Sequence, residues 1–158
     1  MRKTPPDRSL PAPGEGRRGE TGYVGYLLRQ AAHAYQTHLG RVLGDLDVTP
    51  PQFSVMTMVA AYPGLSNADI ARLTFLTPQT VSFIIARLLK AGIVTRRPHP
   101  VHGRIQQLVL TDSGQELLTA AKRRVSAVEK ELVGEVSADD EQVLRLWLAS
   151  ISARLSDD

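Results

Sequence analysis

Residues 65–94, LSNADIARLTFLTPQTVSFIIARLLKAGIV, contain the pattern that decides the fold. A Ser or Thr hydroxyl can accept a hydrogen bond from the free backbone N–H groups at the start of a helix. Ser66 therefore predicts a short helix over about residues 67–74. The apolar residues Ile70 and Leu73 of this helix are expected to face inward.

A second helix is expected after a tight turn. Thr77 can cap it, Pro78 suits its first position, and Gly92 ends it. Its apolar residues repeat at i, i+3, i+4, i+7 and i+8, as on one face of a helix: Val81, Ile84, Ile85, Leu88 and Leu89. Two short helices joined in this way predict a helix-turn-helix, although such helical hairpins also occur in structural cores.

The following stretch, RRPHPVHGRIQQLVLT at 96–111, favours the first interpretation. Residues 93–97 and 104–111 are both prone to form strands, so the six residues between them are expected to form the tip of a hairpin. A helix-turn-helix followed by a hairpin rimmed with arginines is a winged helix. Its second helix would enter the major groove of DNA, and its wing would touch phosphate or the minor groove.

The rest of the chain predicts helices on both sides of this unit. A long helix is expected over 21–46 and a capped one from Thr49 to about Ala61, and two more follow within 112–156. Residues 1–20 are rich in Pro, Gly and charge and predict a disordered arm. The expected fold is therefore mainly α with a small β-hairpin wing, one domain over 21–158 with its winged helix at about 49–111.

Charge and composition narrow the function. No acidic residue lies between Asp69 and Asp112, where six basic residues fall, which suits a polyanion such as DNA but also an ordinary solvated face. The absence of cysteine excludes disulfides and thiolate chemistry. No signal peptide or membrane span is recognisable, so we expect a cytoplasmic protein without membrane association.

Polar residues in the first half of the second helix are the candidates for reading bases. Gln79 can pair with an adenine edge and Ser82 with bases or phosphates, while Phe83 can pack on a thymine methyl. Alternatively, Thr80 and Ser82 are ordinary first-turn residues and Phe83 only packs locally. The complete expected DNA-binding set is Arg72, Thr77, Gln79, Thr80, Ser82, Phe83, Arg87, Lys90, Arg96, Arg97 and Arg104.

Two stretches carry a family resemblance. Residues 76–96, LTPQTVSFIIARLLKAGIVTR, resemble the recognition helix and first wing strand of MarR-type regulators, and 108–118, LVLTDSGQELL, resemble their L-x-LT-x-x-G-x-x-L junction. The resemblance covers roughly residues 20–156. It implies a homodimeric winged-helix regulator, often a repressor that leaves its palindromic operator when a small aromatic or phenolic molecule binds.

The wing departs from the family pattern. Where the family usually reads close to D-P-x-D-R-R, this chain reads HPVHGR at 99–104, so that both acids and one arginine are missing. Only Arg104 matches the groove-facing arginine. His99 and His102 are too few to hold a metal without His33, His38 or carboxylates, so no metal site is expected.

The last helix predicts dimerisation. Its apolar face is broader than one small winged helix can cover: Val143, Leu144, Trp147, Leu148, Ile151 and Leu155. The alternative is packing on the first helix of the same chain. A two-fold dimer would suit a palindromic operator, so we expect the terminal helices of two chains to interleave.

A ligand site is predicted on the first helix. Tyr26, Arg29 and His33 are spaced by three and four residues and share one face, and Phe53 and Met56 of the next helix could supply apolar walls. Arg29 would pair with a carboxylate or phenolate. The alternative is that these residues only line the dimer interface.

Neither catalysis nor a cofactor is expected. Ser113–Gly114 is not a nucleophile elbow, no Gly-rich loop joins a strand to a helix, and the carboxylates cluster at a helix start, where capping explains them. The competing function is a winged helix that binds another protein instead of DNA.

Overall fold

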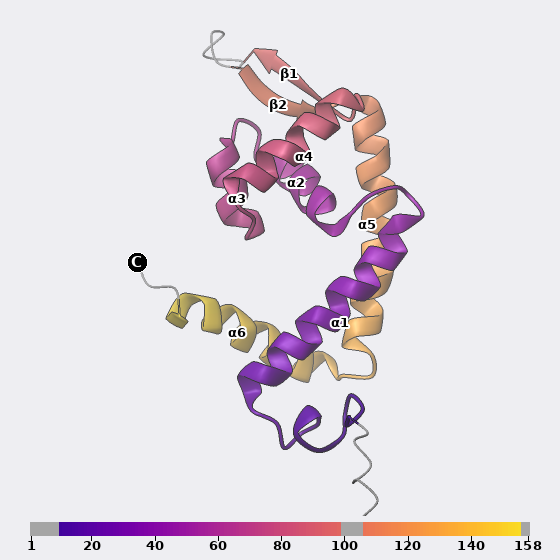
Figure 1. The fold of residues 1–158 in the computed structure, drawn as a ribbon, viewed down its shortest axis with the longest axis vertical. Coiled ribbons are helices and arrows are strands. Elements are labelled where there is room, and N and C mark those ends of the chain that lie inside the picture. The colour runs from indigo at the N-terminus through magenta and orange to yellow at the C-terminus, as the bar shows by residue number, and fades with distance from the viewer. Residues whose placement is uncertain (1–9, 99–105, 156–158) are drawn as a thin grey trace, which may run out of the picture. The chain divides into compact units, whose positions relative to one another are not determined.

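The computed structural model describes residues 10–98 and 106–155. The chain divides into two compact units, residues 1–38 and 39–158, which are described separately below. Figure 1 shows a mainly helical chain with one two-stranded antiparallel hairpin, which confirms the predicted fold class.

The N-terminal unit contains a short 3-10 helix, Gly16–Arg18, and most of α1, Val24–Gly44. Gly14 donates its backbone N–H to the carbonyl of Arg18 over 3.1 Å, which closes a loop before α1. Part of the segment expected to lack structure therefore forms a local turn. The division of the chain into an arm and one domain stays a prediction.

Two helix starts in the C-terminal unit have capping boxes. The Thr49 hydroxyl accepts from the backbone of Gln52 at the start of α2, Pro50–Ala61, and the Gln52 side chain accepts from Thr49 in return. Ser66 and Asp69 repeat this exchange at α3, Asn67–Thr74. Both predicted caps are confirmed, and they fix where each helix begins.

The helix-turn-helix is completed by α4, Pro78–Lys90, which starts at Thr77 as predicted. Phe75 makes the turn in the left-handed backbone region, at φ 56°, a conformation that side-chain-bearing residues rarely adopt. The buried face of α4 is the predicted one: Val81, Ile84, Ile85 and Leu88.

The inward placement of Leu73 was wrong, because its side chain is 48% exposed. Ile70 and Ala71 are the buried residues of α3. At about 100° per residue, Leu73 lies roughly 110° around the helix from the midpoint of these two. One short helix buries only one side, and the pair at 70–71 defines that side.

The wing hairpin consists of β1, Val94–Pro98, and β2, Gln106–Leu110, in antiparallel register from Val94 opposite Leu110 to Pro98 opposite Gln106. Val94 and Leu108 are buried in the core that α2, α3, α4 and α5 form with the hairpin. The hairpin base is therefore fixed to the helices. Residues 99–105 of the predicted tip lie outside the described residues.

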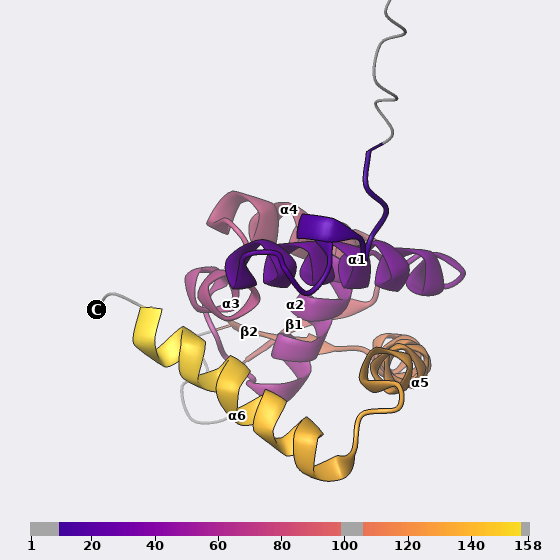
Figure 2. The same cartoon turned by 90° about the horizontal axis from the view of Figure 1, so that it is seen from below.

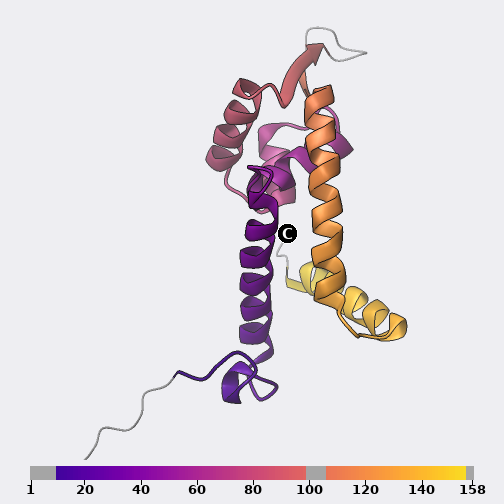
Figure 3. The same ribbon diagram turned by 90° about the vertical axis from the view of Figure 1, so that its right-hand side faces the viewer.

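The junction into α5, Asp112–Val133, brings the start of this helix very close to the backbone that precedes β1. Thr111 caps α5, and its hydroxyl also donates to the carbonyl of Gly92 over 2.7 Å. Gly114 lies so close to Ile93 that a Cβ there would overlap the Ile93 carbonyl oxygen. The Thr-x-x-Gly motif thus joins the start of α5 to the residues just before β1. Figure 3 shows the ribbon of α5 starting beside the hairpin.

The C-terminal helix α6, Ala138–Leu155, has no buried residue. Its exposed apolar residues are Val143, Leu144, Leu146, Trp147, Leu148 and Leu155. Figure 2 shows α6 as a separate rod following α5. Ile151 is partly buried, but most large apolar residues of α6 stay in water, and this pattern is typical of a protein–protein contact surface.

Candidate nucleic-acid interface

The recognition helix α4 has two sides of opposite character. Its apolar side is buried, whereas Gln79, Thr80, Ser82, Phe83 and Arg87 are all exposed. Four of these five residues lie in the first half of the helix, which is the half that meets base edges in helix-turn-helix proteins. The structure thus exposes together, on one helix, the residues that the sequence singled out.

Two of the predicted contact residues already have a local role. The Thr77 hydroxyl accepts from the backbone N–H of Thr80 over 3.2 Å, and the two side-chain hydroxyls lie 2.8 Å apart. These contacts form the N-cap of α4. For Thr77 and Thr80, capping accounts for the side chain without any DNA contact.

Sequence reasoning missed Asn67. Its amide Nδ2 donates to the Ser82 hydroxyl oxygen over 3.2 Å, and this bond connects the start of α3 to the exposed side of α4. Because the Ser82 oxygen only accepts in this bond, the Ser82 O–H can still donate to another acceptor. No local pattern announces this bond, because the partners are 15 residues apart.

Phe83 does not pack into the core. Its side chain is 64% exposed, and the Arg87 guanidinium lies 5.8 Å from the centroid of its ring. A cation over the ring face is attracted by the ring quadrupole, so the two side chains support each other one turn apart. They form an exposed surface that is both apolar and positively charged.

Arg72 is paired with an acid on its own helix. Its Nη1 lies 3.1 Å from Asp69 Oδ1. The hydrogen bond from the Ser66 side chain, then that from the Ser66 backbone, and then the charge of Arg72 hold the pKa of Asp69 below its ordinary value. The stabilisation that ionised Asp69 gives α3 is complete above its ordinary pKa and is lost as pH falls through the lowered one.

The wing contributes arginines on both faces. Arg96 lies opposite Leu108, Arg97 lies opposite Gln107, and both arginines are exposed. Consecutive strand residues point to opposite faces, so the two guanidinium groups leave the hairpin on different sides. Lys90 is exposed at the end of α4. Arg104, His99 and His102 lie outside the described residues.

The predicted ligand residues fall in both units. In the N-terminal unit, the Arg29 guanidinium lies 5.9 Å from the Tyr26 ring centroid, and His33 is exposed. In the C-terminal unit, Met56 is fully buried in the winged-helix core and Phe53 packs half-buried against it. Their assembly into one ligand site stays a prediction.

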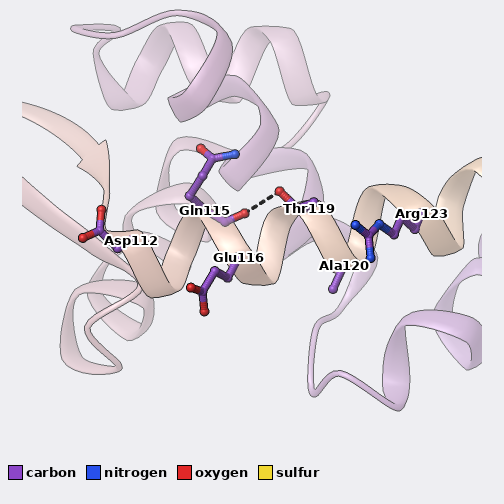
Figure 4. A pocket seen from close by; sticks show the side chains of 6 residues that line it. All are labelled: Asp112, Gln115, Glu116, Thr119, Ala120 and Arg123. Atoms are coloured by element: carbon purple, nitrogen blue, oxygen red, sulfur yellow. Dashed lines mark hydrogen bonds between the residues drawn. The ribbon is translucent and has the colours of Figure 1, made fainter.

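The surface hollow in Figure 4 has a volume of about 460 Å³. All of its described lining residues come from α5: Asp112, Gln115, Glu116, Thr119, Ala120 and Arg123. The Thr119 hydroxyl donates to the Gln115 carbonyl of the same helix over 2.8 Å. Among the residues that the structure describes, the hollow is a furrow along one face of α5 and involves no second element.

Within residues 10–98 and 106–155, no three His, Asp or Glu side chains gather as metal ligands would. None of the helices in this part of the chain is both long and apolar enough to cross a membrane.

A helix-turn-helix whose second helix exposes a polar N-terminal half, followed directly by an antiparallel hairpin, defines the winged helix-turn-helix class of DNA-binding proteins. A sequence model of the MarR family matches residues 46–105. The HTH-type transcriptional regulator YdcH of Bacillus subtilis is 30% identical over 110 residues, which cover 67% of this chain and 75% of that protein. The chain belongs to the MarR family, which confirms the resemblance.

Two further relatives extend the comparison over most of the chain. The HTH-type transcriptional repressor Rv2887 of Mycobacterium tuberculosis is 28% identical over 130 residues, 82% of this chain and 94% of that protein. The structure of Rv2887 with salicylic acid has a TM-score of 0.70 at 27% identity, and the match covers 84% of this chain and 98% of that one.

The transcriptional repressor CouR, solved on a 23-mer DNA duplex, is 27% identical with a TM-score of 0.72. The match covers 82% of this chain and 92% of the CouR chain. The chain is thus a winged-helix transcriptional regulator, from a family of regulators and not of enzymes.

Proposed function

We propose that the protein is a homodimeric repressor that binds a palindromic operator through α4 and the wing and leaves it when a small aromatic acid binds. The observation that carries the proposal is the exposed polar half of α4, in a part of the chain with no acid between Asp69 and Asp112. Duplex DNA is the partner that suits both features.

We assign the recognition of DNA bases to exposed residues in the first half of α4. Gln79 has no capping role, so its side-chain amide can pair with an adenine edge. The Ser82 oxygen accepts a hydrogen bond from Asn67, and the Ser82 O–H can still donate to a base or phosphate. Phe83 offers apolar surface to a thymine methyl. Cations are assigned to position the protein through phosphates, and the exposed ones among the described residues are Arg72, Arg87, Lys90, Arg96 and Arg97. Arg104 of the wing is assigned the same role from the sequence.

Dimerisation is assigned to the terminal helices. Most large apolar residues of α6 are exposed, from Val143 through Trp147 to Leu155. A second copy of the chain would cover this face, and the two recognition helices of the dimer would then be related by a two-fold axis. Half-sites in the operator would then lie about one helical turn of DNA apart.

The relatives support both partners. CouR was solved on a DNA duplex, and Rv2887 was solved with salicylic acid. An effector of that kind would shift the population toward a dimer whose recognition helices are wrongly spaced for the operator. Tyr26, Arg29, His33, Phe53 and Met56 are the residues that we assign to its site.

The proposed function is tested by duplex binding at rising salt. Arg104→Ala should weaken binding to every duplex and lower the salt slope by about one unit, because one phosphate or groove contact is lost. Fluorescence anisotropy of a labelled duplex at several salt concentrations measures both quantities. Arg41→Ala, which removes an arginine from the last turn of α1, is the matched control.

An unchanged salt slope and an unchanged affinity in Arg104→Ala would show that Arg104 of the wing does not contact DNA. Absence of duplex binding by the wild-type protein even at low salt would contradict DNA binding altogether and would favour a protein-interaction module.

The effector is tested by titrating the DNA complex with salicylate. Wild-type protein should release DNA, and Arg29→Ala should resist release because it lacks the cation that pairs with the carboxylate. Anisotropy of the bound duplex follows the release. Equal release by both proteins would overturn the role of Arg29.

A further inference from the structure

The turn that joins α3 to α4 (Figure 1) contains a residue with two unfavourable features. Phe75 has a left-handed backbone, at φ 56° and ψ 32°, and its side chain is 93% exposed. A left-handed conformation costs free energy for any residue with a Cβ, and an aromatic ring in water gains nothing from burial. We propose that Phe75 packs on the 5-methyl group of a thymine at the edge of the major groove, beside the bases that α4 reads.

The backbone of the turn accounts for the conformation of Phe75 but not for its ring. The Ala71 carbonyl accepts hydrogen bonds from the backbone N–H of Phe75, which caps α3, and from that of Leu76 over 3.1 Å. A helix that ends in this way needs a left-handed residue after its last turn, and glycine or asparagine takes up that conformation with the least strain. The turn therefore does not require a phenylalanine.

Core packing does not account for the ring either. The next residue, Leu76, is partly buried and packs against the winged-helix core, whereas the ring of Phe75 stays almost entirely in water. Backbone strain persists at a residue only when something else depends on that residue, and such residues cluster at functional sites. Strain and exposure together thus indicate that the Phe75 ring has a partner outside the chain.

Phe75 continues the surface of α4 that the proposed function assigns to DNA, and the inference rests on that function. It lies just before the cap Thr77 and one helical turn before Gln79, at the end of α4 that meets base edges. The thymine methyl is the apolar group that base pairs present in the major groove, and phenylalanine packs on it. The contact would add a preference for thymine at one position of each half-site.

Fold stability and operator affinity should respond differently to Phe75→Gly. Glycine relieves the strained backbone, so the urea midpoint of the variant should equal or exceed that of wild type. Its affinity for an operator selected from a random duplex pool should fall about fourfold or more, because burial of one methyl group is worth about that factor. Phe75→Asn tolerates the same backbone without the flexibility of glycine and should give the same result.

Tyr62→Ala is the matched control, because it removes an exposed aromatic ring at the end of α2. Its operator affinity should equal that of wild type, as measured by fluorescence anisotropy of a labelled duplex.

Deoxyuridine in place of thymidine removes only the 5-methyl group and tests the contact itself. Wild-type protein should lose about fourfold in affinity when one particular thymine of each half-site is replaced. Neither Phe75→Gly nor Phe75→Asn should lose more at that position, because the ring that meets the methyl group is already absent. At a thymine that Phe83 contacts, the three proteins should lose affinity equally.

The outcomes separate this contact from DNA binding as such. Wild-type affinity in Phe75→Gly overturns the contact, while a specificity loss in Gln79→Ala would still support the proposed function. A lower urea midpoint in both Phe75 variants overturns it as well, because the ring would then stabilise the fold. So does a deoxyuridine effect that is equal in the three proteins at every thymine. A wild-type protein that binds no duplex contradicts the proposed function and the contact together.

Discussion

Replacing Gly114 with alanine should lower the free energy of unfolding by about 3 kcal/mol, because the added Cβ would overlap the carbonyl oxygen of Ile93. That oxygen belongs to the backbone and already accepts hydrogen bonds from the Thr111 backbone N–H and hydroxyl, at 3.0 and 3.1 Å. Neither α5 nor the wing can move away without losing these bonds. Urea unfolding at one fixed protein concentration measures the loss.

Gly25→Ala is the matched control. Gly25 lies in the first turn of α1, where an added Cβ meets nothing within 4 Å. Alanine there should be neutral or stabilise by up to about 1 kcal/mol through helix propensity. Equal stability of Gly114→Ala and Gly25→Ala would show that the close approach of α5 to the wing does not constrain the fold.

Replacing Gln79 with alanine should weaken binding to the preferred operator by about 1–3 kcal/mol and leave binding to unrelated DNA nearly unchanged. A base contact specifies sequence, whereas a phosphate contact only positions the protein. Gln79 suits this test because it is exposed on α4 and lies outside the Thr77 cap. Anisotropy titrations with both duplexes measure the difference.

Gln115→Ala provides the matched control, since this glutamine is also exposed but lies on α5. It should leave both affinities unchanged. Equal losses on both duplexes in Gln79→Ala would reduce Gln79 to a nonspecific contact.

Local signals made most of the winged helix predictable. Ser66, Thr77 and Thr49 each act on backbone groups within three residues, so their roles can be recognised in the sequence itself. The same holds for the apolar repeat of α4. The family resemblance rested on these signals and was confirmed by the comparisons.

Features that depend on residues far apart in the chain could not be predicted from the sequence. The bond from Asn67 to Ser82 joins two helices, and the overlap that fixes Gly114 involves Ile93, which is 21 positions earlier in the chain. Leu73 was misplaced because a short helix gives too few positions to define its buried side. Arg18 and Gln30 likewise meet only through the turn before α1.

The site predictions divide in the same way. For the predicted DNA-binding residues of α4, the structure gives exposure and local contacts, and these favour Gln79 and Ser82 over Thr77 and Thr80 as base readers. The predicted ligand site draws on both units of the chain and stays a prediction. Within the N-terminal unit, Tyr26 lines a cavity together with Arg17, Arg18 and Tyr23.

Selection of bound DNA from a random duplex pool tests the central claim most directly, because it examines DNA binding, sequence reading and two-fold symmetry together. The account predicts enrichment of one inverted repeat whose half-sites lie about 10 base pairs apart, centre to centre. A pool that stays random, or that converges on a sequence without two-fold symmetry, would contradict the account of a dimeric operator-binding repressor.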